Sequence, residues 1–376
     1  MVSENDVVLT LSTILDRFPW RKLEDHLNAF PERIDKSIKK THILRQQYRQ
    51  ELLKNTPTLR QKIKRPSPEK LEWAKQLLLT GTVAASDGTI STVPHLGGSK
   101  IQLGIVIVFN KGKVVDYVTN VMEPEITSGT ESAIKYFQNL RKTRRISSLL
   151  SRALMMHEER NSILKYPADW RMIHGEILPY ELRTGAGNPK HNLPLAFELV
   201  QQFLHNRNFI AVSETSDDID ILNAAILLEP GEYIYIKNLT DVLHLFLDGD
   251  KETGQSKANF SEVDARKFRE FIQQFGNQVS IILAKAGNKP FLLECHSDQI
   301  EEAVSLFMVD SVWTRGLDLN QAILSIRGYP FHIDLADQVA RNLLKASDFQ
   351  NYVEARLFDF ECEGGIFDID PRKMRM

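Results

Sequence analysis

The sequence predicts an α/β domain with a mixed sheet, preceded by a helical extension. From about residue 82 onward, apolar segments rich in β-branched residues alternate with segments of helical length and pattern. Residues 1–78 are instead polar and helical in character. With 376 residues the chain is long enough for a substantial core. We therefore expect a helical N-terminal extension at 1–78 and one large domain at 79–376.

The extension is basic in its second half. Between Arg33 and Arg65 the sequence has eleven Lys or Arg residues against two Asp or Glu residues. A basic helical arm of this kind can follow DNA phosphates, although a solvated helix face is the alternative. Because the formal net charge is only −2, a nucleic acid would have to be bound by such local patches. The residues predicted to bind DNA are Lys39, Lys40, Arg45, Arg141, Lys142, Arg144 and Arg145.

The elements of the domain follow from local pattern. A Pro-Glu pair at 68–69 predicts a helix start. A strand over 82–86 ends at Asp87-Gly88, and the turn Asn110–Gly112 joins two strands of a hairpin. The further strands are expected at 101–109, 113–119, 170–178, 208–213, 233–236, 278–284 and 290–294. Helices are expected at 128–165 (one or two), 194–206, 261–274, 297–306 and 334–346.

Asp87 is the sharpest candidate for chemistry. It follows a strand of small residues, and Gly88 allows the backbone to turn there. A carboxylate at a strand end is a suitable ligand for Mg²⁺ or Mn²⁺, which prefer oxygen donors. An ordinary Asp-Gly turn is the competing interpretation.

Four segments in order resemble the NurA nuclease family. They are VAASDGT at 83–89, Glu158-Glu159 in the long predicted helix, a strand ending near His174-Gly175, and the segment 327–340 around Tyr329. The resemblance spans roughly residues 80–345. It implies an RNase H-like fold, DNA cleavage with Mn²⁺ or Mg²⁺, a HerA-type hexameric ATPase as partner, and a homodimer.

The resemblance also implies a site, carried over residue by residue. The first-strand aspartate falls on Asp87, and the helix glutamate falls on Glu158 or Glu159. Where the family has a second metal-binding aspartate, this chain has His174, with Glu176 as an alternative ligand. A tyrosine falls on Tyr329, and the position often held by His falls on Asp337. The expected catalytic residues are thus Asp87, Glu158, Glu159, Tyr329 and Asp337; the expected metal ligands are Asp87, Glu159, His174, Glu176 and Asp337.

Other classes of protein are disfavoured. Cys295 and Cys362 form no CxxC motif, which argues against a zinc ribbon or a disulfide scaffold. No secretory signal, no stretch of ~20 apolar residues and no Walker A motif is present, so we expect a soluble, cytoplasmic protein without its own ATPase and without a membrane partner.

The function expected from residues and resemblance together is a divalent-metal-dependent DNA nuclease, acting in end processing during repair or antiviral defence. The alternative is a catalytically silent DNA-binding module that couples DNA to the ATPase. His174 in place of an acidic ligand favours that alternative.

Overall fold

The computed structural model describes residues 11–12, 22–95, 97–109, 112–126, 132–214, 219–249, 260–312 and 329–360. The chain divides into two compact units, Met1–Arg60 and Gln61–Met376. The smaller unit contains the 33-residue helix α2 (Leu23–Asn55), which continues past Pro31. Its side chains from Arg33 onward are mostly exposed, and α3 (Pro57–Lys62) follows it.

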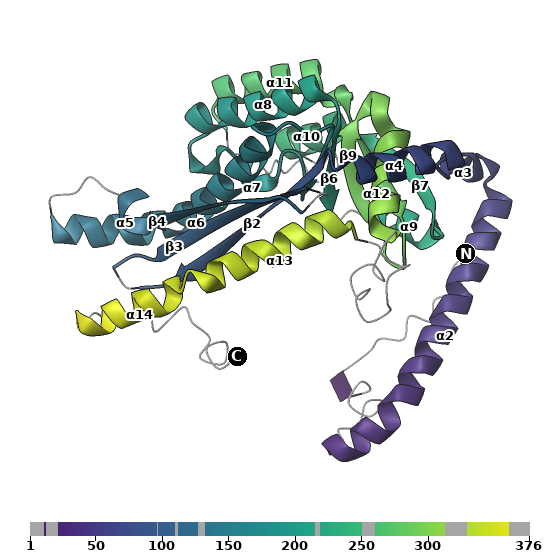
Figure 1. The fold of residues 1–376 in the computed structure, drawn as a ribbon, viewed down its shortest axis with the longest axis horizontal. Coiled ribbons are helices and arrows are strands. Elements are labelled where there is room, and N and C mark those ends of the chain that lie inside the picture. Colours follow the sequence, from purple (N-terminus) through teal and green to yellow (C-terminus); the bar gives the residue numbers. More distant parts are fainter. Residues whose placement is uncertain are drawn as a thin grey trace. The chain divides into compact units, whose positions relative to one another are not determined.

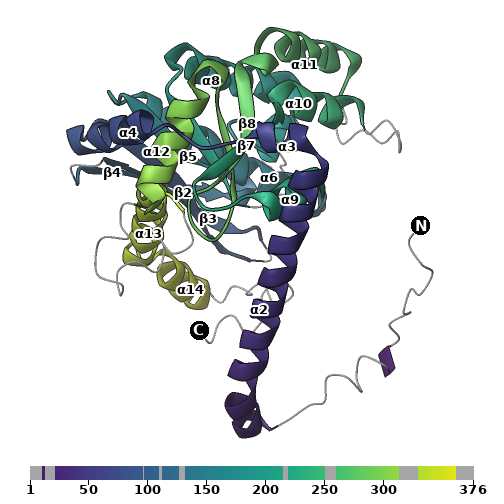
Figure 2. The same ribbon diagram turned by 90° about the vertical axis from the view of Figure 1, so that its right-hand side faces the viewer.

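The larger unit begins before the expected start of the domain. β1 (Ile63–Lys64) pairs with β7 (Glu232–Asn238) of the main sheet. Helix α4 (Pro68–Thr80) lies beside α12 (Ile300–Val312) in Figure 2 and packs against it. Ser67 caps α4 by accepting a hydrogen bond from the backbone N–H of Lys70.

The described part of the larger unit is organised on one mixed sheet, with strand order β1-β7-β8-β9-β6-β5-β2-β3-β4 (Figure 1). β2, β3 and β4 form an antiparallel meander, and β5 and β6 continue the sheet parallel to β2. This is the expected RNase H-like α/β arrangement. The remaining strands are β2 (Val83–Val93), β3 (Lys100–Phe109), β4 (Val114–Met122), β5 (Trp170–His174), β6 (Phe209–Ser213), β8 (Val279–Lys285) and β9 (Phe291–His296).

Helices cover both faces of this sheet. Buried residues of α6, α8, α10 and α11 form the core on one face, and those of α4, α12 and α13 form the core on the other. No helix in the described residues is long and apolar enough to cross a membrane. The helices not yet given are α5 (Glu123–Ile126), α6 (Ala133–Leu164), α7 (Tyr180–Arg183), α8 (Pro189–Asn206), α9 (Ile219–Leu227), α10 (Leu239–Asp248), α11 (Glu262–Phe275), α13 (Phe331–Ala346) and α14 (Phe349–Asp359).

The prediction that the first strand ends at Asp87 is wrong. β2 runs on to Val93, because Asp87 and Gly88 pair with Val106 and Ile105 of β3. A glycine weakens an isolated strand, but pairing with a long neighbouring strand outweighs that local preference.

A second strand is shorter than predicted. β5 ends at His174 instead of extending to residue 178, and Gly175 then adopts a φ of 79°. The ladder between β2 and β5 therefore ends at Ser86 and Ile173, while β2 continues without a parallel partner. We call the place where this ladder ends, beside Asp87 and His174, the notch.

Candidate active site

Asp87 lies at the notch and is only 3% exposed. Val83 and Ala85 belong to the core on the α13 face, so alternation along β2 directs Asp87 to that face as well. Its Oδ1 accepts a hydrogen bond from the backbone N–H of Gly88 at 2.7 Å. The same oxygen lies 3.3 Å from Nδ1 of His174 at the end of β5.

Glu159 reaches the notch from α6, on the opposite face of the sheet. A Cβ at Gly88 would lie 2.9 Å from Cγ of Met155 and 3.4 Å from Oε2 of Glu159, so the approach of α6 depends on this glycine. Burial raises the pKa of Glu159 to about 8; the Arg160 guanidinium opposes this rise, and the charge of Asp87 adds to it. Oε1 of Glu159 is buried and has no hydrogen-bond partner.

His174 is a cation at neutral pH. Partial burial disfavours the imidazolium, but the hydrogen bond to Asp87 and the Asp87 charge outweigh it and raise the pKa of His174 to about 9. The notch thus contains two carboxyl groups and one imidazolium.

Tyr329 borders the same group. Its ring centroid is 6.4 Å from that of His174 in an edge-to-face contact and 5.2 Å from that of Phe291. Burial raises the pKa of the Tyr329 hydroxyl well above its usual value, and the charges of Asp87 and Glu214 act in the same direction. The hydroxyl is therefore a hydrogen-bond donor at neutral pH.

Glu158 lies outside the notch. Both of its carboxylate oxygens accept hydrogen bonds from Nδ2 of Asn161, at 3.2 Å each, and Oε1 is 3.1 Å from Nδ1 of His157. Adjacent helix positions point about 100° apart. Of the two glutamates that the sequence leaves open, the structure therefore places Glu159 beside Asp87.

Glu176, the alternative ligand to His174, does not lie on a strand face with it. Because β5 ends at His174 and the chain turns at Gly175, strand alternation does not extend to Glu176. Its carboxylate instead accepts a hydrogen bond from Arg183 at 2.5 Å.

Asp337 lies on α13 with a partner of its own. It accepts a hydrogen bond from Nε of Arg341 at 2.7 Å. Burial, and then the charge of Asp337, raise the pKa of neighbouring Asp334 to about 6. Both carboxylates also act on the Tyr329 hydroxyl, so the tyrosine borders the Asp87 group and this second acidic pair.

The sequence analysis did not identify two residues near the candidate site, Glu214 and Arg160. Glu214 directly follows β6, and its charge acts on His174 and Tyr329. The rule that carboxyl ends of parallel strands meet at one edge could have identified it. Arg160 had no such signal, because arginine is rarely buried.

Arg160 joins α6 to the end of β5. It is 1% exposed, and its guanidinium donates to the carbonyls of Met156 at 3.0 Å and His174 at 3.1 Å. It also donates to the carbonyl of Glu176 at 2.5 Å. These hydrogen bonds fix the end of β5, which carries His174, relative to α6, which carries Glu159.

The predicted DNA-binding residues fall on two helices. Lys39 and Lys40 are exposed on α2, and Arg45 on the same helix is partly exposed. The second basic cluster lies in α6, and its side chains are outside the described part of the structure; its members are Arg141, Lys142, Arg144 and Arg145.

The divalent cation implied by the resemblance can be tested against the donor atoms. Asp87 and Glu159 offer two carboxyl groups, and Oε1 of Glu159, which makes no hydrogen bond and is 3.7 Å from Arg160, is an atom that a cation could satisfy. Among the described residues, no three His, Cys, Asp or Glu side chains are arranged to hold a metal ion. Two carboxylates suffice for a Mg²⁺-like ion that takes its other ligands from water and phosphate. The residues therefore fit such an ion.

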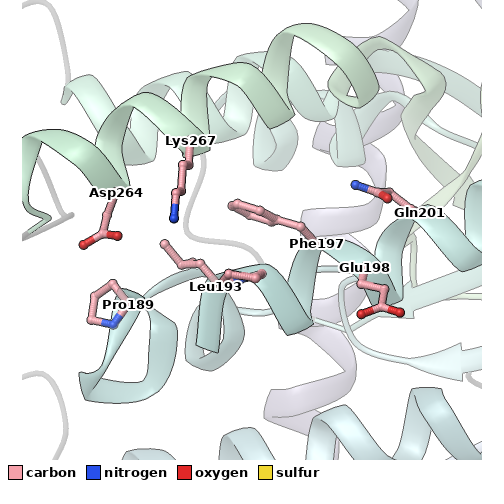
Figure 3. A pocket seen from close by; sticks show the side chains of 8 residues that line it. Pro189, Leu193, Phe197, Glu198, Gln201, Asp264 and Lys267 are labelled. Atoms are coloured by element: carbon pink, nitrogen blue, oxygen red, sulfur yellow. The ribbon is translucent and has the colours of Figure 1, made fainter. Parts of the chain in front are cut away.

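A separate cavity of about 490 Å³ lies between α8 and α11 (Figure 3). Leu193 and Phe197 give it apolar walls, and Glu198, Asp264 and Lys267 are among its polar lining. None of the predicted site residues lines it, so it is distinct from the notch.

The comparisons with known proteins concern structure alone. No protein-family model and no curated protein sequence matches the chain. Among solved structures, the NurA nuclease from Sulfolobus solfataricus is 13% identical, with a TM-score of 0.47, over 90% of this chain and 98% of that chain. A NurA bound to dAMP and manganese is 12% identical, with a TM-score of 0.42, over 81% and 92% of the two chains.

Endonuclease V from Bacillus subtilis is also similar. It is 12% identical, with a TM-score of 0.31, over 74% of this chain and 90% of that chain. The chain is thus similar to NurA nucleases over most of its length, at identities too low for substrate or partners to carry over.

Proposed function

We propose that this chain is a divalent-metal-dependent nuclease that hydrolyses phosphodiester bonds in DNA. The observation that carries the proposal is the buried Glu159 carboxyl group, on which the charge of Asp87 acts and whose Oε1 makes no hydrogen bond, although it lies 3.7 Å from the Arg160 guanidinium. Burying an ionisable group with an unsatisfied oxygen is costly, so such a group is a candidate functional residue.

In this proposal the side chains around the notch have different roles. Asp87 and Glu159 would hold the cation, which when bound lowers the pKa of an attacking water and stabilises the leaving oxygen. His174 offers a positive charge to the anionic phosphate. Tyr329 keeps its proton and can donate a hydrogen bond to a phosphate oxygen.

The direct test is incubation of purified protein with end-labelled DNA, with and without Mn²⁺ or Mg²⁺, beside the Asp87→Ala variant. We expect cleavage by the wild-type chain that needs the metal and is lost in the variant, with the melting temperature maintained. Full activity of Asp87→Ala with Mn²⁺ would remove Asp87 from the site.

One observation favours a catalytically silent module instead. The His174 imidazolium pairs with Oδ1 of Asp87, so one of the oxygens that would bind the metal ion already has a partner. In the nuclease, His174→Ala should lower activity or change the preference between Mn²⁺ and Mg²⁺. In the silent module, wild type should bind DNA without cutting it under either metal, and His174→Asp would supply a third carboxylate and produce cleavage.

The expected partners and setting stay proposals that rest on the resemblance. They are a homodimer, a HerA-type hexameric ATPase, and a cytoplasmic role in DNA repair or antiviral defence. Gel filtration with light scattering, alone and with such an ATPase, tests the first two.

The exposed basic residues of α2 are proposed to contact DNA. Replacing Lys39, Lys40 and Arg45 by Gln should weaken DNA binding and reduce its salt dependence by about 0.7 to 0.9 per lost phosphate contact. An unaltered salt dependence would mean that α2 only presents a solvated face.

A further inference from the structure

Lys289 lies at the same edge of the sheet as the notch. In the ladder between β6 and β9, Ser213 pairs with Leu292, so the connection from β8 to β9 emerges beside the end of β6. β6 pairs with β5 there, His174 opposite Val212. The register thus brings Lys289 next to Glu214, and its Nζ is 3.5 Å from Oε2 of Glu214.

Two aromatic rings connect Lys289 to the candidate site. Its Nζ lies 5.1 Å from the centroid of the Phe291 ring, and that ring contacts Tyr329. Tyr329 in turn contacts His174. The lysine therefore stands at the rim of the same group of residues, about half exposed to solvent, with 44% of its side chain accessible.

The charges around the notch pose a problem for a polyanionic substrate. Acidic groups predominate: Asp87, Glu159, Glu214, Asp334 and Asp337 all act on residues of the site. The nearby cations mostly have fixed partners. The Arg160 guanidinium is buried against backbone carbonyls, and Arg341 holds Asp337.

Lys289 differs from these cations in how weakly it is held. Its contact with Glu214 is at the long limit of a hydrogen bond, and both side chains are close to half exposed. Exposed ion pairs contribute little to stability, so Nζ can exchange Glu214 for a phosphate at little cost. The flexible four-carbon stem allows that movement.

We propose that Lys289 forms a phosphate-binding subsite at the rim of the notch, contacting a backbone phosphate of the bound DNA strand. This subsite rests on the proposed nuclease function. It adds a positively charged residue that contacts the polyanionic DNA strand. Glu214 keeps the lysine in place without substrate and competes with the phosphate for it.

Binding of a fluorescein-labelled single-stranded oligonucleotide, followed by anisotropy in EDTA over a range of salt concentrations, tests this without any cleavage. Lys289→Ala should raise Kd about tenfold, the loss of one charge-assisted hydrogen bond. The slope of log K against log salt should fall by about 0.7. Lys289→Arg should keep most of the affinity, and Glu214→Gln should tighten binding by releasing the lysine.

Lys113 provides a matched control. It lies in the connection between β3 and β4, over the Phe109 ring at 5.4 Å, and Phe109 pairs with Ala84 at the start of β2, away from the β8–β9 connection that carries Lys289. Lys113→Ala should leave both Kd and salt slope unchanged. Equal effects of Lys113→Ala and Lys289→Ala would overturn the subsite, because loss of net charge alone would then explain both.

Activity measurements add a second readout. With Mn²⁺, Lys289→Ala should raise KM with little change in kcat, since the lysine binds rather than reacts. DNA binding that Lys289→Ala leaves intact overturns the subsite while the nuclease proposal stands. A wild-type chain that binds DNA tightly but never cleaves it overturns the nuclease proposal, and the affinity loss in Lys289→Ala still decides the subsite.

Discussion

Glu159 and Glu294 are two buried glutamates near the same end of the sheet, and they differ in one respect. Burial raises the pKa of Glu159 to about 8 and that of Glu294 to about 7. Glu294 accepts a hydrogen bond from the backbone N–H of Ile177 at 2.6 Å. A backbone hydrogen bond from His174 also acts on Glu159, but its Oε1 makes no hydrogen bond and lies 3.7 Å from the Arg160 guanidinium. We infer that Glu294 is built into the fold, whereas one oxygen of Glu159 is left for a ligand.

Arg160 connects the two environments. Its guanidinium is 3.7 Å from Glu159 and donates to the backbone of Glu176, whose charge acts on Glu294. Substitutions at Glu159, Arg160 and Glu294, together with the partly exposed Glu158, separate roles in chemistry from roles in folding.

The largest effect is expected for Glu159→Gln. The amide has the shape of the acid but cannot supply an anionic ligand, so cleavage should fall by roughly a thousandfold. The melting temperature should not fall, because burial already disfavours the charged form of Glu159 and the neutral amide fits the same space. Activity is measured on labelled DNA with Mn²⁺, and retained cleavage would place Glu159 outside the site.

Arg160→Met should come next. It leaves the carbonyls of His174 and Glu176 without their donor, which should destabilise the fold by about 3 kcal/mol, measured by urea denaturation. Arg160→Lys, which keeps the charge but not the planar fork, should be intermediate in stability and should show a reduced kcat. Equal stability of all three proteins would contradict the bridging role.

Glu294→Gln should change the pH dependence of stability and spare activity. The pKa of Glu294 is raised on folding from 4.5 to about 7. Its contribution is therefore fully present below pH 4.5 and is lost as pH rises through 7. The variant should be more stable than wild type at pH 8, by on the order of 2 kcal/mol. Identical shifts of melting temperature between pH 5 and pH 8 in both proteins would be the opposing result.

Glu158→Gln should have the smallest effect. The side chain is partly exposed and faces Asn161 and His157, so stability should change by less than about 0.5 kcal/mol and cleavage should persist. A loss of cleavage like that of Glu159→Gln would show that Glu158 also acts in the site.

Local pattern was sufficient for most of the sheet and helices, but not for the site's geometry. The hairpin through Gly112 and the long helix α6 follow from periodicity and turn residues. The extent of β2 depends on its pairing with β3, which a local window does not contain. Likewise, a sequence cannot show that Gly175 ends β5 and directs Glu176 toward Arg183.

Resemblance identified Asp87 and left Glu158 and Glu159 undecided. Helical phase alone could not separate them, because the choice depends on which side of α6 meets β2. Glu214 and Lys289 were missed for a related reason. They meet only through the register of β6 with β9, which joins segments about 75 residues apart.

Gly88 has a consequence for how the two faces of the sheet communicate. A pleated sheet normally separates the compartments above and below it, so a group on one side cannot share a ligand with a group on the other. Where one strand residue lacks a side chain, a helix on that face can bring its own side chains close to the strand. Any larger residue at Gly88 would press against Met155 and Glu159 and move α6 away from β2, which in the proposed nuclease would separate Glu159 from Asp87.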